Sequence, residues 1–141
     1  MYEIILSIHI ITATTLVLLV IYTDHYGLSW LRGKLNVLDK NKIERLHKAI
    51  YLGIGIMLIT GIYLFWPNKD YLMYVKEFWL KMLFVATLIT NSFLISKLMP
   101  ISFSKAFDLL SARERLPLYI SGFISSLAWI ATILMATKLG L

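Results

Sequence analysis

The chain has 141 residues, of which 59% are hydrophobic and 16% are charged, and its formal net charge is +6. This composition is too apolar for a typical water-soluble domain and predicts a protein that lies in a lipid bilayer. Because the chain has no cysteine, it can form neither disulfides nor thiolate-bound zinc sites, iron–sulfur clusters or thioether-linked haem.

Four long apolar segments divide the chain. A helix needs about 20 residues to cross a hydrocarbon core of roughly 30 Å, and each segment is close to that length. None alternates between apolar and polar residues as barrel strands do. We therefore predict an all-α fold, an integral membrane bundle of four transmembrane helices that forms a single domain over residues 1–141. The predicted helices cover residues 4–24, 43–66, 77–98 and 115–138.

The first predicted helix carries one imidazole, His9, in an otherwise apolar run. Ionisable side chains inside a membrane are energetically expensive and often mark functional sites. A neutral imidazole is a common axial ligand of haem iron, so His9 is a candidate metal ligand. The alternative is structural, with the His9 ring hydrogen-bonded to a nearby hydroxyl such as that of Thr12 or Thr15.

The loop between the first and second helices is rich in basic residues, which favours a cytoplasmic location. These residues are Arg32, Lys34, Lys40, Lys42, Arg45 and Lys48. The loop also contains Trp30 and several leucines, so we expect it to lie on the membrane surface as an amphipathic element. Trp30 would then belong to an interfacial aromatic belt.

The start of the second helix places Glu44 and His47 on one helical face, at about the depth of Asp24 and His25 in the first helix. A Glu-x-x-His pair occurs twice in di-iron bundles but once here. These side chains could bind a metal, and His25 with His47 could supply two axial haem ligands. The alternative is a salt-bridged helix end, in which Arg45, Lys48 or Arg32 neutralises the carboxylates.

Prolines and small residues predict helix ends and packing faces. We expect Pro67 and Asn68 to end the second helix, Pro100 to end the third, and Pro117 to lie in the first turn of the fourth. Pairs of small residues spaced four apart let membrane helices approach closely, and we expect their faces to be buried. The pairs are Ala49 with Gly53, Ser121 with Ser125, and Gly122 with Ser126.

The third predicted helix carries Lys81 about three residues from its start and Asn91 farther along. Since the first and third helices begin on the same side of the membrane, we expect His9 and Lys81 to share one pocket in the outer leaflet. The lysine could pair with a haem propionate there, or extend its amine to the headgroups. Asn91 lies within a few turns of the level of Asp24 and His47.

The loop between the third and fourth helices is also basic, through Lys97, Lys105, Arg113 and Arg115. Both basic loops are therefore predicted to be cytoplasmic, in a multi-pass protein of the inner (plasma) membrane whose two ends face outward. We expect residues 102–115, like the first loop, to lie on the membrane surface. The positive charge fits contact with anionic lipid and does not point to nucleic acid, for which no groove-entering element is present.

Three stretches of the chain resemble a known family. They are S-I-H-I-I at residues 7–11, L-I-T-G-I-Y-L-F at residues 58–65 and F-W-L-K-M-L-F-V-A-T-L-I at residues 78–89. Over roughly residues 5–95 the chain is similar to the small membrane proteins of the HemJ protoporphyrinogen oxidase group, and to the related four-helix CopD-type and DUF2269-type proteins. The resemblance implies b-type haem, with His9 and Lys81 as the functional pair.

The leading hypothesis is an integral membrane redox protein that binds haem b, with HemJ-like protoporphyrinogen oxidation as its most concrete activity. The candidate cofactor-binding residues are His9, His25, His47, Lys81 and Asn91, and a porphyrinogen or a quinone would reach them from the bilayer. The second hypothesis is a non-catalytic accessory subunit of a larger membrane complex, or a homo-oligomer. The third, a CopD-like metal permease, requires polar groups across the whole bilayer, and the third helix offers few.

Overall fold

The computed structural model describes residues 1–139, which form four long helices and no strand. The long helices are α1 (Tyr2–Leu31), α2 (Lys40–Leu72), α3 (Lys76–Leu98) and α4 (Ala112–Lys138), and the short 3-10 helices are η1 (Met99–Phe103) and η2 (Phe107–Leu109). Each long helix is long and apolar enough to cross a membrane. The predicted all-α architecture with four transmembrane helices is therefore confirmed.

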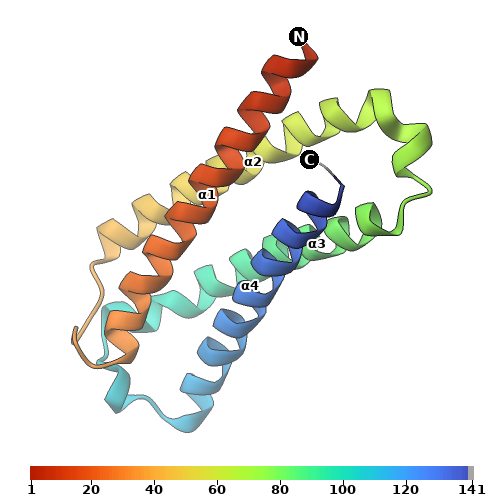
Figure 1. Cartoon of the computed structure of the whole chain (residues 1–141). Helices are drawn as coiled ribbons and strands as arrows, with labels where there is room; N and C mark the ends of the chain where they lie inside the picture. Colours follow the sequence, from red (N-terminus) through yellow and green to blue (C-terminus); the bar gives the residue numbers. More distant parts are fainter. Residues whose placement is uncertain (140–141) are drawn as a thin grey trace.

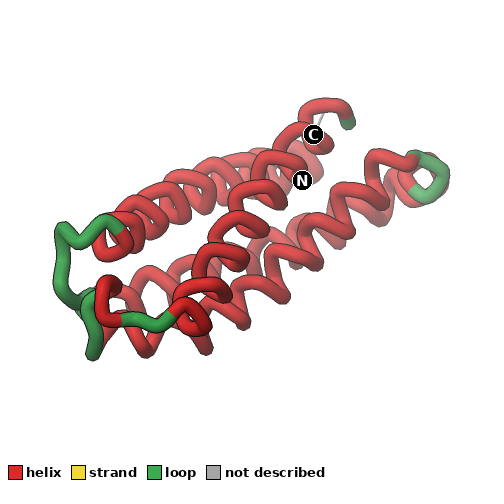
Figure 2. Tube along the Cα trace, turned by 90° about the horizontal axis from the view of Figure 1, so that it is seen from below, coloured by secondary structure: helices red, strands yellow, loops and turns green. Residues whose placement is uncertain are grey.

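The bundle consists of two antiparallel hairpins, because α1 packs against α2 and α3 packs against α4 (Figure 1). The N-terminus, the end of α4 and the turn between α2 and α3 lie toward one end. Figure 2 shows the two longer loops, residues 32–39 and 99–111, together at the opposite end. This is the relative placement that the distribution of basic residues predicted. Which end faces the cytoplasm stays a prediction.

Two predicted helix ends are wrong. Helix α1 continues past residue 24 to Leu31, and α2 continues through Pro67 to Leu72. Proline removes one backbone N–H from the helix, but polar side chains can supply hydrogen bonds to the same turn of a membrane helix. Here the Asn68 side chain donates to the carbonyl of Leu64 at 3.1 Å. The carbonyl that Pro67 leaves without its usual donor is that of Tyr63, so this bond adds a contact within the same turn and does not replace the missing one.

The other two proline predictions have different outcomes. Helix α3 ends at Leu98, and Pro100 lies in η1, as expected. Pro117 is not in the first turn of α4, since that helix already begins at Ala112. The earlier start is explained by a capping box, in which the Glu114 carboxylate accepts from the backbone N–H of Ser111 at 2.8 Å. A capping box satisfies amides that the start of a helix otherwise leaves unpaired.

The small residues pack closely at only some of the predicted positions. Gly53 is buried, and a Cβ atom there would lie 2.5 Å from Cδ2 of Leu16, so the backbones of α1 and α2 approach closely at this point. Ser121 and Ser125 of α4 are buried as predicted. The prediction is wrong for Ala49, Gly122 and Ser126, which are exposed.

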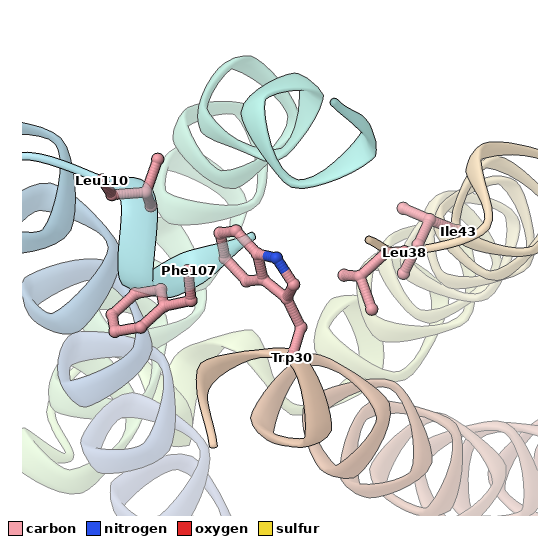
Figure 3. Close-up of a cluster of buried hydrophobic side chains, with 5 residues drawn as sticks. All are labelled: Trp30, Leu38, Ile43, Phe107 and Leu110. Atoms are coloured by element: carbon pink, nitrogen blue, oxygen red, sulfur yellow. The ribbon is translucent and has the colours of Figure 1, made fainter. Parts of the chain in front are cut away.

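A compact apolar cluster lies at the end of the bundle that carries the two longer loops. This Trp30 cluster consists of Trp30, Leu38, Ile43, Phe107 and Leu110 (Figure 3). The Trp30 side chain is 1% exposed, and its Nε1–H donates to the carbonyl of Lys105 at 3.0 Å. The rings of Trp30 and Phe107 pack edge to face, with their centroids 5.2 Å apart. The backbone N–H of Leu38 donates to the carbonyl of Ser102 at 2.8 Å. The two loops are therefore joined directly.

The Trp30 cluster corrects one expectation. Trp30 does not belong to an interfacial aromatic belt, because its side chain is buried against residues of both loops. The location of the loops on the membrane surface stays a prediction. The hydrophobic effect acts where water competes for apolar surface, and lipid chains provide no such drive between helices. Leu38, Phe107 and Leu110 of the loops are consequently buried against each other or Trp30, while Val37 and Leu109 are exposed. The helices also keep large apolar side chains exposed along their length.

Candidate functional site

Two cavities lie between the hairpins. The first, which we call the His9 cavity, has a volume of about 520 Å³ and is lined by His9 and Lys81. The second, the His47 cavity, has a volume of about 550 Å³ and is lined by Asp24, His47 and Asn91. The two cavities meet, since Ile54, Leu88 and Trp129 line both of them. Ligand-binding sites in helix bundles commonly occupy such spaces between helices.

The His9 ring is held by a side chain of the neighbouring helix. Its Nδ1 atom lies 2.7 Å from Oγ1 of Thr60 on α2. The Thr60 hydroxyl also lies 2.8 Å from the carbonyl of Ile56, to which it donates. The contact engages Nδ1 of His9 and leaves Nε2 without a hydrogen-bond partner within residues 1–139. A hydroxyl has a single proton, so when the Thr60 hydroxyl donates to Ile56, its oxygen accepts from His9 and the imidazole proton is on Nδ1. The Nε2 lone pair is then free to bind a metal.

The hydrogen-bond partner of His9 differs from the two partners that the structural alternative predicted. Thr12 and Thr15 were the expected partners within α1, but the Thr15 hydroxyl donates to the carbonyl of Ile11 at 2.8 Å, and the partner of His9 is Thr60. Sequence reasoning missed Thr60, although it lies within residues 58–65, one of the stretches that carry the family resemblance. Its role depends on the register between α1 and α2, which only the packing determines.

Lys81 and His9 line the same cavity, as the sequence predicted from the shared direction of α1 and α3. Lys81 is half-buried. Within residues 1–139, no carboxylate lies within ion-pair distance of its ammonium group. A cation in such a position attracts an anionic group of a ligand, because the low dielectric of the surroundings strengthens the interaction.

Aromatic side chains form part of the wall of the His9 cavity, together with a larger number of aliphatic ones. Phe65 of α2 stacks on Phe78 of α3 with ring centroids 5.3 Å apart, and Trp79 and Trp129 line the same space. Gly61 lies opposite His9, where an added Cβ would be 3.6 Å from Cε1 of the imidazole. These flat, apolar surfaces suit a planar hydrophobic ligand.

The candidate residues at the opposite end are only partly brought together. Asp24 and the half-buried His47 line the His47 cavity, but His25 is exposed and lines neither cavity. Glu44 pairs on the surface with Lys40 at 3.7 Å, which differs from the basic partners predicted for it. Among residues 1–139, no three His, Asp or Glu side chains are grouped to hold a metal. The arrangement does not support His25 and His47 as two axial ligands of one haem.

Asn91 is engaged in a reciprocal contact with α4. Its Nδ2 donates to the carbonyl of Ser121 at 2.9 Å, and the Ser121 hydroxyl donates to Oδ1 of Asn91 at 2.9 Å. Both residues are buried. Asn91 lines the His47 cavity, but these hydrogen bonds first serve to join α3 to α4. Sequence reasoning singled out Asn91 and missed Ser121 as its partner.

Comparison with models of protein families gives no match, and neither the comparison with curated proteins nor the comparison with solved structures gives one. The function is therefore argued from the residues and geometry of the two cavities.

Proposed function

We propose that this chain is an integral membrane protein that binds haem b in the His9 cavity and performs or relays redox chemistry, with HemJ-like protoporphyrinogen oxidation as its most concrete activity. The observation that carries the proposal is the contact between His9 and Thr60 beside Lys81. It combines a metal-ligating nitrogen with a cation in one aromatic-walled cavity.

The residues present fit haem in three respects. Histidine ligands of metals usually donate their second ring N–H to a protein oxygen, which fixes the tautomer and the ring orientation. Oγ1 of Thr60 lies 2.7 Å from Nδ1 of His9, where it can accept such a bond. The Lys81 ammonium can pair with a propionate carboxylate. The aromatic walls exclude water from the face of a flat macrocycle. When bound, haem b supplies a carrier for single electrons.

A membrane location also fits the substrate class. The cavity lies between two hairpins within the part of the chain that spans the bilayer, so a hydrophobic porphyrinogen can reach it from the lipid. We propose a multi-pass protein of the inner (plasma) membrane, with the loops at residues 32–39 and 99–111 in the cytoplasm because of their basic residues. His9 and Lys81 would then lie in the outer leaflet.

Absorbance spectra of the detergent-purified protein test the proposal. We expect a Soret band with α and β bands after dithionite reduction, in wild type, His25→Ala and His47→Ala, and loss of these bands in His9→Ala. Lys81→Met should retain the bands but bind haem more weakly. Protein that folds and carries no haem, even when haem is supplied, would refute the proposal. Loss of the bands in His47→Ala but not in His9→Ala would refute the assigned ligand.

The accessory-subunit and permease hypotheses predict different results from the haem proposal. An accessory subunit or homo-oligomer would co-purify as a larger assembly, carry no haem of its own and lose only stability in His9→Ala. A CopD-like permease needs polar groups along its whole path, whereas the residues common to both cavities are Ile54, Leu88 and Trp129. This apolar junction favours ligand binding over ion transport.

A further inference from the structure

The His47 cavity contains polar groups that the proposed haem site does not use. Asn91 and Ser121 satisfy each other, and the Tyr51 hydroxyl lies 2.6 Å from Oγ of Ser96 and 3.1 Å from the carbonyl of Ser92. Those four side chains have partners on neighbouring helices. They hold the walls of the cavity in place.

Asp24 and His47 differ from these residues. Both line the cavity, and within residues 1–139 neither has a hydrogen-bond or ion-pair partner. His47 is half-buried and Asp24 is exposed, so the polar atoms of both side chains are accessible to a ligand that enters the cavity. The pair therefore offers a carboxyl group and an imidazole to a polar ligand in the cavity.

The helix register places the two side chains close to the same level. In the antiparallel pair, His9 of α1 contacts Thr60 of α2, and Leu16 of α1 lies against Gly53 of α2. Continued along both helices, this register puts Asp24 beside Arg45, which is within one helical turn of His47. A carboxyl group and an imidazole thus share the end of the cavity nearest the loops.

We propose that the His47 cavity binds a membrane-soluble quinone, with the imidazole of His47 hydrogen-bonded to one ring carbonyl and the Asp24 carboxyl beside it. The largely apolar walls suit a planar ring with an isoprenoid tail. The imidazole can donate to a carbonyl oxygen of the oxidised ring, and the carboxylate can accept from a hydroxyl of the reduced ring. The choice of a redox-active ligand rests on the proposed redox function. The observation that Asp24 and His47 have no partner within residues 1–139 is independent of that function.

The position of this cavity suits an electron partner. Since Ile54, Leu88 and Trp129 line both cavities, a ring in the His47 cavity and a macrocycle in the His9 cavity could both contact these three side chains. A ligand could enter between the two hairpins from the bilayer, without passing the Trp30 cluster that closes the end of the bundle.

Tryptophan fluorescence provides a direct test, because Trp30 and Trp129 line the His47 cavity and a nearby quinone ring quenches indole emission. We would titrate the purified protein with ubiquinone-1 in detergent. We expect saturable quenching that weakens about tenfold in His47→Ala, as loss of one hydrogen bond in a buried site implies. His47→Gln, which keeps an N–H donor, should recover part of the binding. His9→Ala, measured alongside, reports on the other cavity. Thr14→Val, at an exposed position outside both cavities, is the control and should bind as wild type does.

Two results would overturn the proposal. Quenching that rises linearly and equally in every variant would show that the quinone only partitions into the micelle. Weaker binding in His9→Ala with no change in His47→Ala would place the quinone in the other cavity. Haem spectra of the same samples separate the two proposals, since saturable quenching without a Soret band would refute the haem site alone. A Soret band without saturable quenching would refute the quinone site alone.

Discussion

The Nδ1 atom of His9 on α1 lies 2.7 Å from the hydroxyl oxygen of Thr60 on α2. The pair joins the two helices of the first hairpin and leaves Nε2 of the imidazole as the nitrogen available to a ligand. Thr60 therefore acts on any bound metal through His9, without contacting it.

Replacing Thr60 by valine should weaken haem binding by about tenfold to a hundredfold, the usual effect of removing the hydrogen-bond partner of a metal-ligating histidine. Valine keeps the shape of threonine, so folding should be nearly unchanged. Titration of haem into the purified apoprotein, followed at the Soret band, measures the effect. Thr14→Val is the control, because the exposed Thr14 hydroxyl bonds only to its own helix at the carbonyl of Ile10. Equal haem affinity in the two variants would contradict the role given to Thr60.

Substitution of Gly53 by alanine should destabilise the α1–α2 hairpin by about 1–3 kcal/mol, as overpacking of a close contact does. The added Cβ would lie 2.5 Å from Cδ2 and 2.8 Å from Cγ of Leu16, and Leu16 is buried. Unfolding in detergent with increasing dodecyl sulfate measures the change. Gly55→Ala is a matched control on the same helix, since an added Cβ there meets nothing within 4 Å. Shortening Leu16 to alanine in the Gly53→Ala background should recover part of the loss.

The contact between Asn91 and Ser121 predicts unequal effects of two alanine substitutions. Ser121→Ala removes one hydrogen bond and should cost about 0.6 kcal/mol, the average for such contacts between membrane helices. Asn91→Ala removes two and leaves the Ser121 hydroxyl buried without this partner, so it should cost more. The same unfolding assay, extended to the double variant, measures the coupling. An Asn91→Ala variant as stable as wild type would show that this pair does not hold α3 against α4.

From the contacts of Trp30 we predict how substitutions at this position change the stability of the bundle end that carries the two loops. Trp30→Phe keeps an aromatic ring but loses the hydrogen bond to Lys105, and should cost about 1 kcal/mol. Trp30→Ala leaves a cavity in the cluster and should cost about 3–5 kcal/mol. Protease cleavage at Lys105 should accelerate in the same order, because the loop is released from α1. If the alanine variant resisted cleavage as well as wild type, the cluster would not be what holds the loop.

The absence of cysteine makes the membrane orientation easy to test with single-cysteine variants. Tyr74→Cys in the turn between α2 and α3 and Ser104→Cys in the loop between α3 and α4 replace exposed residues at opposite ends of the bundle. An impermeant maleimide should label Tyr74→Cys in intact cells and Ser104→Cys only after permeabilisation, because basic loops stay in the cytoplasm. The reverse pattern would invert the proposed topology and move His9 to the cytoplasmic leaflet.

The architecture was predictable from the sequence because lipid imposes a simple rule. Backbone groups must be satisfied within each span, so long apolar runs form helices, and the directions of successive helices alternate. This was enough to bring His9 and Lys81 to one cavity. Local signals were less reliable, since the second helix passes through Pro67 and the fourth starts at a capping box before its predicted first residue.

The hydrogen-bond partners of the polar side chains could be identified only from the tertiary structure. His9 meets Thr60, and Asn91 meets Ser121, through contacts between residues far apart in the chain. The two basic loops also fold against each other around Trp30, a contact that the prediction of amphipathic surface elements did not include. The apolar pattern of a loop does not say whether lipid or another loop will cover it.

The sequence by itself determined the class of protein, the four spans and the two loops in which basic residues gather, because hydrophobicity and charge act through the bilayer in each segment separately. The tertiary structure alone decided which nitrogen of His9 is free, which groups in the His47 cavity lack partners, and that the two cavities meet at Trp129. These features depend on helix register and on side chains from several helices converging, and hydropathy along one segment carries no information about either.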